Sequence, residues 1–364
     1  MAESKAIKID WYRCPIDSTT LRNLTKRSDL KGFLYTMGQV VLIGGSGFLT
    51  YLFFVRSAWI AFAVTFWIHG IIRTMSASGF HEFSHGTVFK SKWLNTFFLR
   101  IWSLINWSNH HHYKMSHTYH HLYTLHPAGD GEVVLPRKLP LKLWVVLQIF
   151  TVRIDDIVRR YFKFIRVAFT GKYDDEWSKR IFGPDQALPF KRTVRWTRIV
   201  LLFHIAVLVI SLLFGEWIIP IIFSLGGSVG TWLIFFVGGT MHAGLRDNVP
   251  DFRKCVRSIR LDPISGYLRW NMHYHIEHHM FAAVPCYNLG RLYRAVAADM
   301  PKRRSLIGAW REIKETERRQ KTDPSYQFDT PVPEPSKVSH EQDPIGAAIG
   351  DIKPRDYTET VPIK

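Results

Sequence analysis

Long runs of uncharged residues constrain the fold of this chain more than any other feature. The first run, Gly32 to Val55, holds 24 residues without a charged side chain, and as a helix it would be about 36 Å long at roughly 1.5 Å per residue. The hydrocarbon core of a bilayer is about 30 Å thick. The run is therefore long enough to cross a membrane.

The apolar runs come in two pairs. Only Arg56 separates the first run from a second one that begins at Ser57, and much later only Glu216 separates two further runs. Connections this short force each pair into an antiparallel hairpin. We therefore predict an all-α integral membrane protein with four transmembrane helices arranged as two hairpins. The predicted spans are about 32–55, 57–79, 199–215 and 217–241.

The positions of the basic residues predict the orientation. The connector between the hairpins is rich in Lys and Arg, whereas the two short turns carry little positive charge beyond Arg56. By the positive-inside rule the connector and both termini are cytoplasmic, in a bacterial inner membrane or the endoplasmic reticulum. The expected parts are an N-terminal segment (1–31), a membrane domain (32–321) whose cytoplasmic helical cap comprises 80–198 and 242–321, and a Pro-rich, polar, disordered tail (322–364).

The net charge of +18 could also indicate nucleic-acid binding. Basic clusters beside membrane-spanning helices are more simply orientation signals and contacts to anionic lipid. No nucleic-acid-binding motif accompanies the charge. We therefore expect membrane lipid, and no nucleic acid, among the partners.

The histidines are concentrated where the predicted helices leave the membrane on the cytoplasmic side. "HEFSH" places two of them at i and i+4, and "SHTYHH" and "HIEHH" each place three at i, i+3 and i+4, so each group shares one helical face. "GTMHAG" adds one at the exit of the fourth span. The nine candidate metal ligands are His81, His85, His117, His120, His121, His242, His275, His278 and His279.

Nine imidazoles are too many for one ion and suit two ions with four or five ligands each. Imidazole binds iron, copper, nickel or zinc, and spacing alone does not choose among them. "HEFSH" also matches the zinc metalloprotease signature, but a protease would leave six clustered histidines unexplained. A transporter would place its ligands near mid-bilayer. A non-catalytic metal-binding membrane protein remains a further alternative.

The order "HEFSH", "SHTYHH", "MHAG" and "NMHYHIEHHMFAAVPCYNL" resembles the membrane-bound fatty acid desaturase and hydroxylase superfamily over roughly residues 32–300. The resemblance implies a non-haem di-iron centre held by the nine histidines above, with O2 as co-substrate. His273 departs from the Asn that the family often has, and we expect it, with Asn271 and His110, near the ligands rather than among them. No separate protein base is identified.

The resemblance also implies a reaction class. Two irons with open coordination positions can activate O2 to oxidise an unactivated C–H bond of a fatty acyl or lipid chain. Desaturation is the leading expectation, with hydroxylation or oxidative decarboxylation to a terminal alkene as alternatives on the same scaffold. Electrons would come from a separate ferredoxin, rubredoxin or cytochrome b5.

Overall fold

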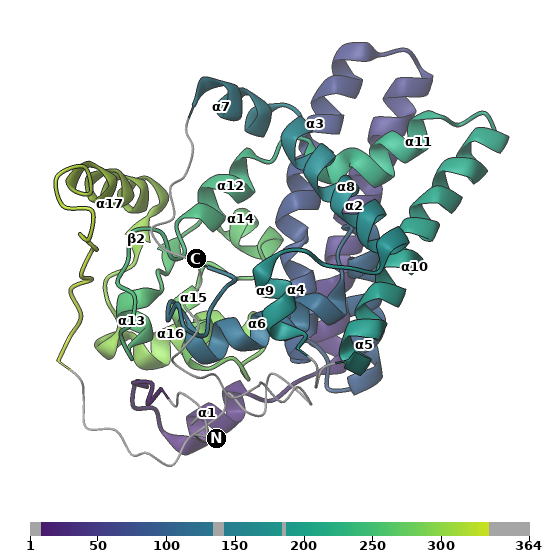
Figure 1. Ribbon diagram of the computed structural model, residues 1–364. Coiled ribbons are helices and arrows are strands. Elements are labelled where there is room, and N and C mark those ends of the chain that lie inside the picture. The colour runs from purple at the N-terminus through teal and green to yellow at the C-terminus, as the bar shows by residue number, and fades with distance from the viewer. Residues whose placement is uncertain (1–8, 134–141, 184–186, 335–364) are drawn as a thin grey trace.

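Three long apolar helices dominate the structure (Figure 1). The computed structural model describes residues 9–133, 142–183 and 187–334. The long helices are α2 (Asp29–Val55), α3 (Trp59–Ser76) running on into α4 (Ser78–His85), and α10 (Ala187–Leu213). Each is 27 residues long and apolar enough to cross a membrane. Large apolar side chains such as Ile60, 84% exposed, cover their outer surfaces, which indicates an integral membrane protein.

Helices α2 and α3 lie side by side in opposite directions, joined by a turn at residues 56–58 (Figure 1). Ser28 Oγ caps the start of α2 by accepting a hydrogen bond from Lys31 N at 3.3 Å. Between the two helices, Ser46 Oγ lies 2.8 Å from His69 Nδ1. A polar contact of this kind ties the two apolar helices together in one arrangement.

The predicted fourth span, 217–241, is not one continuous helix. It consists of α11 (Ile218–Pro220), the π-helix η2 (Ile221–Leu225), the 3₁₀ helix η3 (Gly226–Ser228) and α12 (Trp232–Gly239). Between η3 and α12 the chain is extended at Val229 and left-handed at Gly230, where φ is +57°. The uncharged run in the sequence does not reveal this break.

Two hydrogen bonds from another part of the chain stabilise the break. Arg153 N donates to Ser228 O and Gly230 N donates to Thr151 O, both at 2.8 Å. The loop around Thr151 therefore satisfies backbone groups that a continuous helix would have satisfied internally. This pairing joins segments far apart in sequence, so local sequence patterns could not predict it.

The remaining elements form the cap and the connections around it. Before the break they are α1 (Ser18–Leu24), α5 (Lys92–Ile105), α6 (His110–Tyr123), α7 (Leu143–Phe150), α8 (Ile154–Thr170) and α9 (Glu176–Ile181). After it they are α13 (Phe252–Cys255), β1 (Ile259–Arg260), α14 (Pro263–Leu268), α15 (His275–Met280), η4 (Cys286–Asn288), α16 (Leu289–Val296), η5 (Ala297–Asp299), β2 (Arg304–Ser305) and α17 (Leu306–Arg319). Strands β1 and β2 form a parallel pair, with Ile259 opposite Arg304.

The core of the cap lies where α3 meets α4. The indole nitrogens of Trp102 and Trp270, both fully buried, donate to Ser76 O at 3.0 and 3.1 Å. A Cβ on Gly79 would lie 2.6 Å from the Trp270 ring, so only glycine fits there. These contacts hold the first turn of α4, and therefore the first histidine pair, against the rest of the cap.

The first residues of the segment expected to be a disordered tail contact the cap. Phe328 N donates to Gly244 O at 2.7 Å, and the side chain of Thr330 is buried. Residues 335–364 of that expected tail, including His340, lie outside the described part of the chain. Within the described residues, the chain therefore stays in contact with the cap well past residue 322.

Candidate metal centre

Four elements bring the nine predicted histidines to one place. Helix α4 carries His81 and His85, α6 carries three, the turn after α12 carries His242, and α15 carries the last three. Helix α6 is fixed at its start by Asn109, whose Oδ1 accepts from His111 N and His112 N at 3.1 Å. Asn109 Nδ2 donates in turn to Thr193 O of α10 at 2.7 Å. The helix that supplies three histidines is thus anchored to a long apolar helix.

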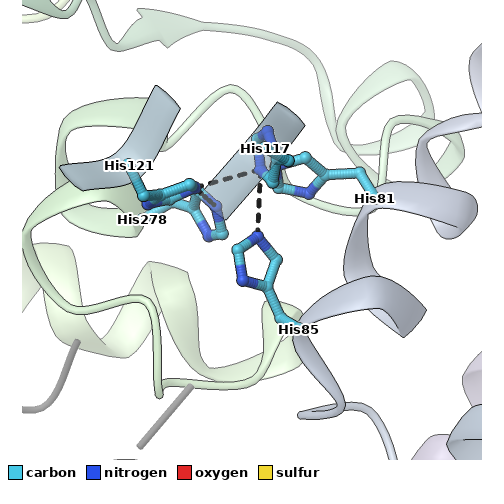
Figure 2. Close-up of side chains that lie close together, drawn as sticks. All are labelled: His81, His85, His117, His121 and His278. Atoms are coloured by element: carbon cyan, nitrogen blue, oxygen red, sulfur yellow. Dashed lines mark hydrogen bonds between the residues drawn. The ribbon is translucent and has the colours of Figure 1, made fainter. Parts of the chain in front are cut away.

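Five of the nine form the first cluster (Figure 2). Its members are His81, His85, His117, His121 and His278. One ring nitrogen from each lies within 4.8 Å of the corresponding nitrogens of the others. His117 Nε2 is 3.2 Å from His85 Nε2 and 3.0 Å from His121 Nε2. His121 Nε2 is also 3.3 Å from His278 Nε2.

The other four form the second cluster. His120, His242 and His279 also lie with one ring nitrogen of each within 4.8 Å of the others. His275 completes the group, because its Nε2 is 3.1 Å from His242 Nε2 and 3.3 Å from His279 Nε2. The rings of His121 and His279 stack at 4.3 Å between centroids, so the two clusters are adjacent.

These spacings fit metal coordination. A metal–nitrogen bond of about 2.0–2.1 Å places neighbouring ligand nitrogens roughly 2.8–3.4 Å apart in octahedral or tetrahedral geometry. Hydrogen bonds alone do not account for the contacts. A neutral imidazole has one N–H and one lone pair, so His117 Nε2 cannot accept from both His85 and His121 while its Nδ1 is engaged elsewhere. A cation between the rings satisfies every lone pair at once.

Three of the histidines have a carboxylate beside the ring nitrogen Nδ1. His81 Nδ1 lies 2.7 Å from Glu82 Oε1, His117 Nδ1 lies 3.1 Å from Glu132 Oε1, and His120 Nδ1 lies 2.8 Å from Asp130 Oδ2. A carboxylate that accepts from Nδ1 leaves the Nε2 lone pair directed inward and makes it a stronger metal ligand.

For two other histidines of the second cluster, neutral oxygens lie beside Nδ1 instead of a carboxylate. His242 Nδ1 lies 3.1 Å from Cys255 O, and His279 Nδ1 lies 3.1 Å from Thr124 Oγ1. None of these partners was predicted from the sequence. Asp130 and Glu132 lie in a loop whose fold returns them to α6, and no spacing rule indicates that return.

Burial favours the form of histidine that binds metals. It lowers the pKa of His121, His278 and His279 well below the usual value. The neighbouring histidines lower these pKa values further. The three rings are therefore neutral at pH 7, and each can offer a lone pair to a cation.

The three predicted supporting residues lie outside the two clusters. The ring of His110 packs against Trp196 with centroids 4.3 Å apart. Asn271 Nδ2 donates to Cys286 O at 3.1 Å. The ring of His273 lies against Gly266, where a Cβ would come within 2.8 Å of it.

A cavity of about 640 Å³ adjoins both clusters, within the usual size range of small-molecule sites. Its wall includes His81 and His117 of the first cluster and His120, His242 and His275 of the second. The apolar part of the wall is formed by Phe80, Ile105, Trp107, Val133, Ile234, Phe235, Met241 and Met272. An apolar chain inside this cavity would lie directly beside the histidines.

Comparison with known families gives one result. The sequence model described as fatty acid desaturase matches residues 57–310, more than two thirds of the chain, and the matched region contains all nine histidines. No curated protein matches the chain.

Proposed function

Because the chain belongs to the fatty acid desaturase family, whose members are di-iron oxidoreductases, we propose that it desaturates a fatty acyl chain with O2. The observation that carries this proposal is the convergence of nine imidazole rings in two adjacent clusters at the wall of a cavity. Removal of two hydrogens with reduction of O2 to two waters needs two further electrons and two protons. A separate ferredoxin, rubredoxin or cytochrome b5 would supply the electrons.

In this proposal each cluster holds one iron. The first cluster supplies His81, His85, His117, His121 and His278, and the second supplies His120, His242, His275 and His279. Both donor sets consist of imidazoles, which suit iron. Bound iron would supply the oxidising power that breaking an unactivated C–H bond requires.

The protein's own residues hold and orient the substrate. Phe80, Phe235 and Met272 present apolar surface to the cavity, so an acyl chain can replace water there. The carboxylates behind His81, His117 and His120 keep these rings in one tautomer. Histidines held in fixed positions and an acyl chain confined to the cavity place one carbon beside the oxidant. That placement decides which bond is oxidised.

The arrangement in the membrane is also part of the proposal. We propose a membrane domain over residues 32–321 with four membrane-crossing segments as two hairpins, the fourth broken at η3. The cap and both termini would face the cytoplasm. Support comes from the three 27-residue apolar helices and from the basic residues of the connector.

The test uses the full chain, purified in detergent and loaded with iron. His278→Ala in the first cluster and His279→Ala in the second should each lose about one of the two irons and all acyl oxidation, because each removes one ligand. His340→Ala, far along the chain, is the control and should keep both irons. Iron content by mass spectrometry, O2 consumption and product mass spectra are measured together.

The same measurement separates the alternatives. An alkene within the chain supports desaturation, an alcohol indicates hydroxylation, and a terminal alkene one carbon shorter indicates oxidative decarboxylation. Full iron content and turnover in both histidine variants would refute the assignment of the ligands.

A further inference from the structure

The cavity beside the metal centre carries more positive than negative side chains. Its wall includes the arginines Arg73, Arg153, Arg160 and Arg269, and the carboxylates Glu132 and Asp156. Both carboxylates are already engaged. Asp156 pairs with Arg160, and Glu132 accepts hydrogen bonds from His117 Nδ1 at 3.1 Å and Ser116 Oγ at 2.9 Å.

Arg269 is the arginine in this wall with the weakest partners. Its Nη1 donates to Ser78 Oγ at 2.7 Å, and its Nη2 contacts Met241 Sδ at 3.4 Å. Its Nε is buried without a hydrogen-bond partner. Burial lowers the pKa of Arg269 to about 10, so the guanidinium stays charged at pH 7. Arg269 as a whole is half-buried, and a hydroxyl and a thioether do not neutralise its charge.

Two buried arginines of this chain are paired with acids. Arg257 Nη2 lies 2.7 Å from Glu312 Oε1, and Arg253 Nη2 lies 2.9 Å from Asp251 Oδ2. Arg73 donates to the main-chain oxygens of Phe223 and Ile105 at 2.9 and 2.5 Å, which gives it a structural role beside the broken span. In the described part of the chain, Arg269 has no such carboxylate or carbonyl partner.

The position of Arg269 links it to the metal centre. Ser78 precedes His81 by three residues on α4, a rise of about 4.5 Å. Met241 directly precedes His242. A guanidinium so close to a site proposed for two metal cations is repelled by them. An anion bound between them would offset this repulsion and complete the hydrogen bonding of Arg269.

We propose that Arg269 binds the carboxylate of a free fatty acid, with the acyl chain lying along the cavity. This inference rests on the proposed function, because it takes the cavity to be the site of the acyl substrate. A planar guanidinium matches the two oxygens of a carboxylate. An ester or thioester would present a neutral carbonyl at the same point and would leave the charge of Arg269 unpaired.

The test measures binding to the purified full chain, with and without iron. The probes are hexadecanoic acid, its methyl ester and its CoA thioester, so the first two differ chiefly in head-group charge. The variants are Arg269→Gln, which removes the charge, and Arg269→Lys, which keeps the charge but not the planar fork. Arg260→Gln, at an exposed arginine of β1, is the matched control.

The wild-type chain should bind the acid at least about 10-fold more tightly than the methyl ester. Arg269→Gln should weaken binding of the acid about 10- to 100-fold and change binding of the methyl ester little. The affinity of Arg269→Lys for the acid should lie between those of the wild type and Arg269→Gln. Arg260→Gln should bind both probes as the wild type does. Iron content and the unfolding midpoint of each variant show whether the fold is retained.

Two binding results would overturn the inference: equal affinity of the wild type for acid and ester, or an equal loss of affinity for both probes in Arg269→Gln. Oxidation of the thioester but not of the acid would also overturn it, while the proposed function would stand. Selective binding of the acid without oxidation of any probe by the iron-loaded, reduced protein would support the anion site and refute the proposed function.

Discussion

The two ring nitrogens of a histidine in the metal centre have different roles. The Nε2 atoms face one another across the clusters, and several Nδ1 atoms face carboxylates outside them. Asp130 illustrates how much one such carboxylate organises. Its Oδ2 lies 2.8 Å from His120 Nδ1 and accepts from Leu125 N, and its Oδ1 accepts from Glu132 N. One side chain therefore orients a proposed ligand and shapes the loop that carries Glu132.

Replacing Asp130 tests this role. Asp130→Asn should weaken iron binding about 10- to 100-fold, because the amide lacks the charge that strengthens His120 as a ligand. Iron titration followed by mass spectrometry measures the change. Asp17→Asn is the control, because Asp17 also accepts from a backbone N–H, that of Thr20, but at the start of α1. Equal iron affinity in the two variants would contradict the role of Asp130.

At the scale of elements, the close approach of α3 to the broken span positions the cavity. A Cβ on Gly70 of α3 would lie only 2.2 Å from Val229 O, so the two backbones touch at this point. Residues of both segments line the cavity, including Thr74 from α3 and Ser228 from η3. The break in the fourth span is thus part of the cavity wall.

A pair of glycine substitutions tests this contact. Gly70→Ala should lower the free energy of unfolding by about 1–3 kcal/mol, because the added methyl group overlaps Val229 O. Gly44→Ala in α2 is the matched control for Gly70→Ala. No atom lies within 4 Å of a Cβ there, so alanine should raise stability by up to about 1 kcal/mol. Denaturant unfolding in detergent measures both, and equal stabilities of the two variants would contradict the predicted contact.

For the whole molecule, the testable property is the side of the membrane on which each part lies. The turn at Ser57 and the segment at Ser325 are exposed and should lie on opposite sides. Cys14, Cys255 and Cys286 are free but buried, so they should contribute little background labelling. Single substitutions Ser57→Cys and Ser325→Cys therefore report on the two sides.

A membrane-impermeant maleimide distinguishes the orientations in intact cells. Ser57→Cys should react from outside, and Ser325→Cys should react only after the membrane is opened. The reverse pattern would contradict the proposed orientation. Reaction of both from the same side would contradict the hairpin arrangement of the spans.

The sequence by itself predicted an all-helical membrane protein, a histidine-rich metal centre and the family. These follow from local patterns: uncharged runs long enough to cross a bilayer, and histidines at i, i+3 and i+4 on one helical face. Such patterns depend only on residues near one another in the chain, so they can be recognised without a structure.

Only the tertiary structure decided the sorting of the nine histidines and the residues around them. His120 and His121 are neighbours on α6 but belong to different clusters, because the histidines of α4 lie beside His121 and His242 lies beside His120, while α15 supplies histidines to both clusters. The break at Gly230 and the position of Arg269 beside Ser78 likewise arise from contacts between distant segments, and the loop after α6 returns Asp130 to His120. Packing determines such contacts, and helical periodicity contains no information about them.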